Sequence, residues 1–181
     1  MERHSGGWCT IIEPGVACED DEMVSQVMTI IIAIAAVGSA LIAGVFFAFS
    51  TFVMTALFRL PVEQGVAAMQ SINRVILGSL FMPVFFGTAG CCAVCVLAWF
   101  LQWGGVDRIT ILIGSALYLI GTFLGTIVFN VPLNNELASL DSKSAAATET
   151  WRRYARSWTL WNHVRTVAAL AAAIALGIVA T

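Results

Sequence analysis

Charged residues are scarce in this chain of 181 residues: they make up 11% of it, whereas a soluble domain carries about 25%. Hydrophobic residues account for 59% of the chain, and the mean hydropathy is +0.88. This composition excludes a soluble globular domain and indicates an integral membrane protein. The length suits four membrane spans joined by short loops and leaves no room for a second folded domain.

The motifs of common cofactor sites are also missing. The chain has two histidines, and it contains neither a His-Glu-x-x-His motif nor the acid–histidine spacing typical of di-iron bundles. Only one histidine falls within an expected span, which argues against haem held by two histidines. A glycine-rich nucleotide loop and a basic block for nucleic acid are absent as well. We therefore expect no metal, no recognised cofactor and no nucleic-acid partner.

The five cysteines do not form a secreted disulfide framework, because Cys91, Cys92 and Cys95 lie inside an apolar segment. Their simplest interpretation is as small packing residues. The alternative is a thiol–quinone oxidoreductase, in which Cys92-x-x-Cys95 would work with Cys9 and Cys18 in the tail. No charged residue near the pair would favour the reactive thiolate, so this alternative is the weaker one.

Residues 1–22 hold six of the 11 acidic residues and show no hydrophobic periodicity, which predicts a disordered tail. They lack the basic start and the short apolar core of a signal peptide. Met23 opens directly onto the first apolar segment, and we hypothesise that it is the biological start. The membrane domain is accordingly predicted to cover residues 23–181.

Apolar segments mark the spans, which we expect at about Val27–Phe58, Val75–Leu101 and Ile109–Val131, with a fourth near the end of the chain. Between the first two spans, apolar residues recur at helical spacing over residues 62–74, which predicts a short interfacial helix. The predicted fold class is all-α, a four-helix transmembrane bundle with this short helix between spans one and two.

Prolines and glycines add detail to the second and third spans. Pro83 predicts a kink in span two, and Pro132 predicts a break in the helical ladder at the end of span three. The spacing Gly121-x-x-x-Gly125 permits close contact between span three and another helix.

Basic residues are divided unevenly between the two sides of the membrane. The tail and the loop after span two hold Arg3 and Arg108, and the opposite side holds the other seven lysines and arginines. The positive-inside rule then places the loops after spans one and three in the cytoplasm and both termini outside. The lipid bilayer is the expected partner, and the sequence indicates no oligomeric state.

The segment Trp158–Arg165, which reads W-T-L-W-N-H-V-R, precedes the last apolar run, Val167–Ala180. That run has 14 residues, and a spanning helix needs about 20. The span must therefore start near Trp158, which draws Arg165 about 10 Å inside the membrane edge. Trp158, Asn162 and Arg165 follow i, i+4, i+7 spacing and share one helix face. An ionisable residue at such depth is costly and by default marks a functional site with a partner.

Three polar clusters fall at the same membrane face: Asn73-Arg74, Asn130–Glu136 and Asn162–Arg165. Each alone has an ordinary interpretation, since asparagines often cap helices. Together they predict an aromatic-walled pocket with an arginine, amides and an imidazole near its base. Glu136 is the expected counter-ion of the arginine, with Asp141 as the alternative.

Several stretches resemble the anthrone oxygenase-like membrane proteins, a group whose bacterial members mostly have no assigned function. The resemblance covers about Met23–Thr181, implies four transmembrane helices and points to a bacterial cell membrane. The stretches are G-V-F-F-A-F-S-T-F-V-M, M-Q-S-I-N-R, F-M-P-V-F-F-G-T, N-V-P-L-N-N-E-L and W-x-x-Y-x-x-x-W-T-x-W-N-H-V-R-T.

The resemblance also implies a chemistry and most of the site residues. We add His163 and Trp158 from their chemistry and position in the sequence. Fungal members oxidise anthrones to anthraquinones with molecular oxygen and no recognised cofactor. We expect Arg165, His163 and Asn162 to be catalytic, with His163 as the base and Arg165 holding the anion. Substrate contacts are expected from seven further residues: Asn73, Arg74, Asn130, Asn134, Asn135, Trp158 and Trp161.

Three functions remain open on the sequence. The first is an oxygenase acting on an apolar aromatic such as an anthrone or a phenol. The second is the thiol–quinone oxidoreductase described above. The third is a non-enzymatic membrane subunit or small-molecule-binding protein whose polar cluster only locks helix packing. Turnover of an aromatic by the purified protein separates the first from the third.

Overall fold

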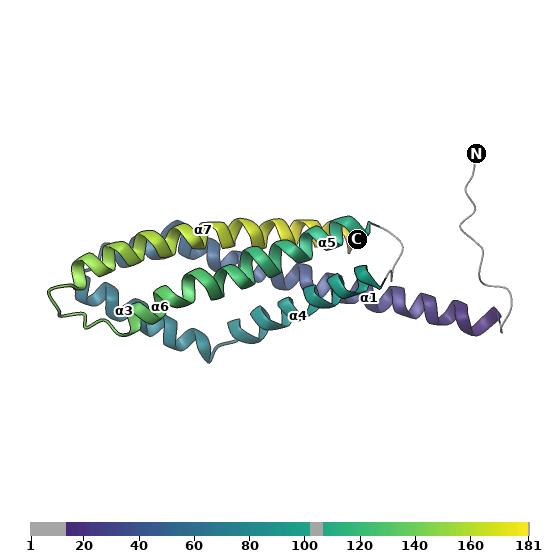
Figure 1. The fold of residues 1–181 in the computed structure, drawn as a ribbon, viewed down its shortest axis with the longest axis horizontal. Coiled ribbons are helices and arrows are strands. Elements are labelled where there is room, and N and C mark those ends of the chain that lie inside the picture. The colour runs from purple at the N-terminus through teal and green to yellow at the C-terminus, as the bar shows by residue number, and fades with distance from the viewer. Residues whose placement is uncertain (1–13, 102–106, 181) are drawn as a thin grey trace.

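The computed structural model describes residues 14–101 and 107–180, and all regular structure within these ranges is helical. Helices far apart in the chain run lengthwise beside one another in a bundle (Figure 1). The symbol η marks π-helical segments below. The elements are α1 Pro14–Ala48, η1 Phe49–Val53, α2 Met54–Phe58, α3 Val62–Leu77, α4 Phe81–Phe100, α5 Arg108–Ala116, η2 Leu117–Leu124, η3 Thr126–Asn130, α6 Val131–Ala138 and α7 Ala147–Val179.

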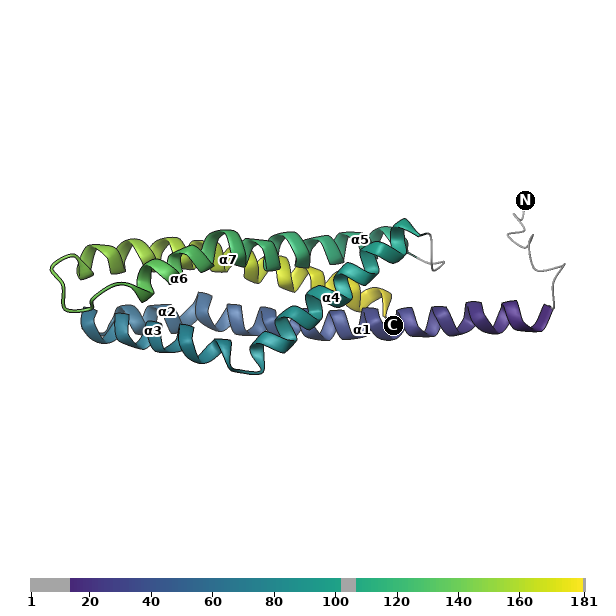
Figure 2. The same cartoon turned by 60° about the horizontal axis from the view of Figure 1, so that its bottom comes forward.

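Four helical stretches are long and apolar enough to cross a membrane: Glu22–Phe58, Phe81–Phe100, Arg108–Ala138 and Ala147–Val179. The predicted four-helix transmembrane bundle is confirmed. Helix α7 packs against α1 and against α5, and helix α4 packs against the same two helices. Figure 2 shows α4 crossing the bundle obliquely, with the N-terminal part of α1 extending beyond it.

Small residues bring the spans into close contact, as the glycine spacing predicted. A Cβ added at Gly121 would lie 2.5 Å from the Cβ of Ala168 on α7. A Cβ at Gly38 would lie 2.0 Å from Oγ1 of Thr88, so α1 and α4 meet in the same way. Span three therefore lies closely against α7, whose Arg165 belongs to this interface.

Helix α3 occupies the place predicted for a helix between spans one and two. It packs on α6 and α7, with Val66 and Met69 buried. The chain then breaks at Gly78–Leu80, and α4 begins at Phe81. The expected kink at Pro83 is therefore wrong. Pro83 lies in the first turn of α4, where its missing N–H removes no helical hydrogen bond.

Span three continues as one helical path from Arg108 to Ala138, so the predicted break at Pro132 is also wrong. The π segments η2 and η3 occupy its middle, and η3 ends at Asn130. Pro132 follows in the first turn of α6. The hydrogen bonding changes from the π to the α pattern at this point, and the first turn of the α pattern tolerates a residue without an N–H.

Helix α1 begins at Pro14, so residues 14–22 are helical although they were expected in the disordered tail. Proline suits the first turn of a helix because its φ is already helical there. Residues 1–13, the rest of the predicted tail, lie outside the described residues.

Candidate functional site

Helix α7 carries the centre of the site on one face. It runs unbroken through Trp158, Asn162 and Arg165, and all three side chains are buried, with Arg165 only 3% exposed. Their i, i+4, i+7 spacing predicted a shared face, and burial of all three confirms it. Tyr154, one turn earlier, extends this buried face.

The Arg165 guanidinium makes two hydrogen bonds and two cation–π contacts. Its Nη2 donates to Oδ1 of Asn162 at 2.7 Å, and its Nη1 donates to Oγ1 of Thr126 at 3.2 Å. Its Cζ lies 4.2 Å from the ring centre of Phe46 and 5.2 Å from that of Trp158. The remaining donor, Nε, is buried without a hydrogen-bond partner. Arg165 is thus oriented on two sides, and its Nε–H is among the donors left unused.

Asn162 joins α7 to span one. Its Nδ2 donates to the Phe46 carbonyl oxygen and to Oγ of Ser50, each at 2.7 Å. The Ser50 hydroxyl also lies 3.1 Å from the Thr166 hydroxyl, which donates to the Asn162 carbonyl at 2.8 Å. The Asn162 amide therefore has both of its ends occupied, and its orientation is determined by this network.

Three π-helical segments supply the rest of this network. Ser50 lies in η1, Thr122 in η2, and both Thr126 and Asn130 in η3. The Thr122 hydroxyl donates to the Arg165 carbonyl at 3.4 Å. A π turn widens a helix locally, and such turns are often found at functional sites. Here they coincide with the level at which spans one and three face Arg165.

Asparagines of span three form a second layer around Trp158. Oδ1 of Asn134 accepts hydrogen bonds from the Tyr154 hydroxyl and from Nε1 of Trp158, each at 2.9 Å. Nδ2 of Asn130 donates to the Trp158 carbonyl at 3.3 Å, and its Oδ1 is buried without a partner. Asn73 lies beside the Tyr154 hydroxyl, and its buried Nδ2 makes no hydrogen bond.

The exposed apolar side chains of α7 locate the network in the membrane. They begin at Leu160, which is 60% exposed, and recur to Ile178, which is 66% exposed. Arg165 lies five residues beyond Leu160, or about 7 Å along the helix axis. It therefore sits just inside the apolar belt, close to the depth predicted from the sequence.

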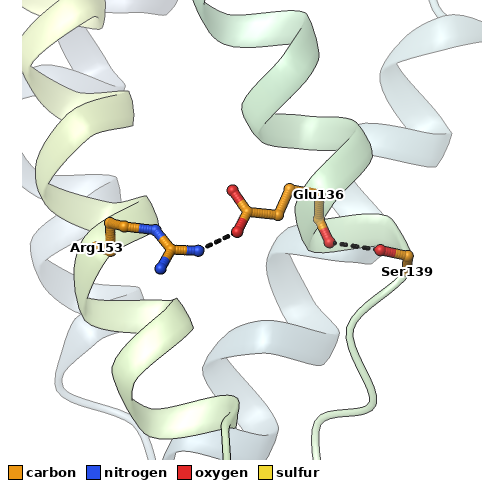
Figure 3. Close-up of polar contacts among 3 residues, drawn as sticks. All are labelled: Glu136, Ser139 and Arg153. Carbon is orange, nitrogen blue, oxygen red and sulfur yellow. Dashed lines mark hydrogen bonds and ion pairs between the residues drawn. The ribbon is translucent and has the colours of Figure 1, made fainter.

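No carboxylate pairs with Arg165 among the described residues. Glu136, the expected counter-ion, instead forms an ion pair with Arg153 at the surface, as Figure 3 shows. Asp141, the alternative, is exposed and accepts a hydrogen bond from the Lys143 backbone. Both counter-ion predictions are therefore wrong. The Glu136 carboxylate lies on α6 and points toward Arg153 in the first turns of α7, away from Arg165.

The free energy of the contacts around Arg165 is large enough to offset the cost of burying an unpaired cation. Burying an arginine costs about 2.5–3.5 kcal/mol at mid-membrane on insertion scales, and less near the edge. A desolvated cation–π contact contributes about 2 kcal/mol, and a hydrogen bond from a charged donor about 1.5–3 kcal/mol. The fold can therefore retain the positive charge without neutralising it.

Four of the predicted site residues lie apart from the network. Arg74, Asn135 and His163 are exposed. The half-buried Trp161 stacks on Phe129 with ring centres 3.5 Å apart. Since α7 turns by about 100° per residue, His163 faces away from Asn162, and it lines a groove on the outer side of α7.

Reasoning from the sequence missed several members of the network: Phe46, Ser50, Thr122, Thr126, Tyr154 and Thr166. Tyr154 alone had a usable signal, because it extends the spacing of Trp158 and Asn162 by one turn. Hydroxyl residues in a span commonly bond to their own helix. Thr51 does so, with its Oγ1 donating to the Phe47 carbonyl at 2.7 Å, and nothing in the sequence separates it from Ser50.

The cysteines of span two lie elsewhere. Cys92 and Cys95 are unpaired and buried in the apolar core that α1, α4, α5 and α7 share. Among residues 14–101 and 107–180, no group of three His, Cys, Asp or Glu side chains is placed to hold a metal ion.

Comparison with known protein families identifies the family of this chain. The family profile described as anthrone oxygenase matches residues 77–175, which is more than half of the chain and includes span two, span three and the Arg165 face of α7. No curated protein and no solved structure matches the chain. With four helices able to cross a membrane and this match, the chain belongs to the anthrone oxygenase family.

Proposed function

We propose that the protein oxidises an apolar phenol-like aromatic, of which an anthrone is the reference compound, with molecular oxygen inside the membrane. The observation that carries this proposal is Arg165: a buried guanidinium with aromatic neighbours and, among the described residues, no carboxylate partner. A positive charge held in this way suits an anion that forms only during a reaction.

The reaction balances without a further reagent. An anthrone loses a proton from its ring CH2 group, which leaves an anion with the charge spread onto its oxygen. Molecular oxygen takes electrons from the ring carbon and bonds to it, and a proton completes a hydroperoxide. Loss of water from the hydroperoxide leaves the second carbonyl, so one anthrone and one oxygen molecule give one anthraquinone and one water.

The network offers groups for the anion at each stage. The Nε–H of Arg165 and the Nδ2 of Asn73 are buried donors without a hydrogen-bond partner. The rings of Phe46 and Trp158 add apolar surface for an aromatic substrate. Because Arg165 is 3% exposed, a substrate reaches it only after neighbouring side chains move aside.

The side chains of the network do not supply the proton acceptor. The amides and hydroxyls of the network are not bases at neutral pH, and His163 faces the outer groove. In the proposed reaction the cation has the larger role, since an adjacent positive charge favours the ionised form of the substrate. Water can then accept the proton.

A packing role for Arg165 is the competing explanation, because it links α7 to span three through Thr126. Two variants separate the explanations. Arg165→Met removes the charge, and we expect turnover to fall by about 100-fold or more, the usual effect of losing one anion-stabilising group. Arg165→Lys keeps the charge without the planar fork of donors, so turnover should fall less.

The measurement pairs oxygen consumption and quinone absorbance on an anthrone with the melting temperature in detergent, after subtraction of the rate without protein. Lost turnover with unchanged or higher melting temperature supports the proposal, because the methionine removes the cost of burying a charge. Normal turnover in a destabilised Arg165→Met protein would assign Arg165 to packing alone.

A further inference from the structure

A second feature lies on the outer side of the bundle, apart from the Arg165 network. It is a groove of about 930 Å³ between the end of span one and the first half of α7. Its charged lining comprises four arginines and one glutamate: Arg59, Arg152, Arg153, Arg156 and Glu149. We call it the arginine groove.

The positive charge of the arginine groove is largely uncompensated. Arg153 is paired with Glu136, as described above. Arg59, Arg152 and Arg156 are exposed and form no ion pair with any residue of the described ranges. Three guanidinium groups therefore face one opening and have one acid, Glu149, in the lining.

The same groove continues into the apolar belt. Phe58 and Leu160 line it and are 49% and 60% exposed. Beyond it on α7, Val164 and Val167 are 45% and 67% exposed. The change from Arg156 to Leu160 takes one helical turn, or about 6 Å. A ligand that fills the groove thus meets cations at one end and a lipid-facing apolar surface at the other.

We infer that the arginine groove binds an anionic phospholipid, with its phosphodiester at Arg59, Arg152 and Arg156 and its acyl chains along Phe58 and Leu160. Guanidinium groups match the geometry of phosphate oxygens. The positive-inside rule assigns this end of the bundle to the cytoplasmic leaflet, where anionic lipids are enriched. A soluble anion would leave the apolar end unused, and a zwitterionic lipid would bring its own cation. The inference is independent of the proposed oxidation.

The test uses the full-length protein purified in a neutral detergent and titrated with phosphatidylglycerol, with bound lipid counted by native mass spectrometry. Arg59→Gln, Arg152→Gln and Arg156→Gln are made singly and together. A basic residue near a membrane surface contributes to anionic lipid binding by about five-fold in affinity. We expect about that loss in each single variant and about 100-fold in the triple variant. Arg74→Gln, an exposed arginine of α3 outside the groove, is the matched control and should bind normally.

Three further measurements make the result decisive. Arg152→Lys should keep most of the affinity, because the charge remains. Phosphatidylcholine with the same chains should bind far more weakly, and inorganic phosphate should not raise the melting temperature at concentrations where phosphatidylglycerol does. The inference is overturned if the triple variant and Arg74→Gln bind equally well, if phosphatidylcholine binds as tightly, or if inorganic phosphate stabilises as much as the lipid. Should the triple variant misfold, the single variants still decide.

Discussion

Neighbouring residues of α7 have different roles because a helix presents each to a different side. Asn162 is fully buried and bonded at both ends of its amide, whereas His163 is exposed in the arginine groove. The same sorting separates Asn134, bonded to Tyr154 and Trp158, from the exposed Asn135. Residue identity alone therefore does not separate the polar groups that join the Arg165 network from those that face outward.

The charge on Arg165 can be neutralised without touching the arginine. Thr126 lies next to its Nη1, so Thr126→Asp places a carboxylate there, while Thr126→Asn has the same size and no charge. We expect turnover on an anthrone to fall about 100-fold in Thr126→Asp, because a permanent anion replaces the transient one. Thr126→Asn should stay within about ten-fold of the parent protein, because it lacks that charge. Equal rates in the two variants would show that the net charge at Arg165 does not matter.

His163 provides a test of the base predicted from the sequence. Because its side chain faces the arginine groove, we expect His163→Gln to retain turnover and to change the free energy of unfolding by about 0.5 kcal/mol or less, as for most exposed substitutions. The measurement is the rate across pH together with the melting temperature. A large loss of rate at unchanged stability would identify His163 as the base and move the reaction to the outer side of α7.

At the scale of elements, the site depends on where two spans depart from regular α-helix. The segments η1 and η3 contribute Ser50, Thr126 and Asn130, and they face the same stretch of α7. Close approach of span three to α7, through Gly121 and Ala168, brings Thr126 within hydrogen-bond reach of Arg165. Helix packing and the polar network are therefore coupled.

Gly121→Ala tests this coupling. The added methyl would lie 2.5 Å from the Cβ of Ala168, so we expect a loss of about 1–3 kcal/mol in stability, as in overpacked cores, and a lower turnover. Gly90→Ala on α4 is the control, since an added Cβ meets nothing within 4 Å. It should be neutral or stabilising by up to about 1 kcal/mol, the helix preference for alanine over glycine. Melting temperatures of the two variants in the same detergent make the comparison, and equal values would contradict the close contact.

At the scale of the whole molecule, basic residues gather at the end of the bundle formed by α2, α3, α6 and the start of α7. Figure 1 places α3 and α6 at this end and the C-terminus at the other. The arginine groove belongs to the basic end, and the Arg165 network lies between it and the middle of the membrane. The molecule is thus cation-rich at one end.

Orientation in the membrane is a prediction of this charge distribution. With both termini outside, alkaline phosphatase fused after Thr181 should be active and a fluorescent protein fused there should be dark. Fusions after Ser142, in the loop after span three, should show the reverse pattern. A fluorescent C-terminal fusion together with active phosphatase at Ser142 would invert the predicted topology and place the arginine groove in the outer leaflet.

The sequence by itself determined the class of the protein and the buried face of α7 that carries Arg165. Composition and the apolar segments predicted four spans, and the short final run, Val167–Ala180, predicted that Arg165 would lie inside the membrane edge. The spacing of Trp158, Asn162 and Arg165 predicted their common face. These inferences depend on length and periodicity along one helix, which local sequence carries.

Tertiary structure alone decided which polar groups meet. It brought Phe46 and Thr126 to Arg165 and Ser50 to Asn162. It also paired Glu136 with Arg153 and turned His163 outward. The physical reason is that lipid is as apolar as a protein core. The apolar pattern that separates the inner from the outer face of a soluble helix is therefore weak in a membrane span, and only the packing of the helices against one another assigns each face its neighbours.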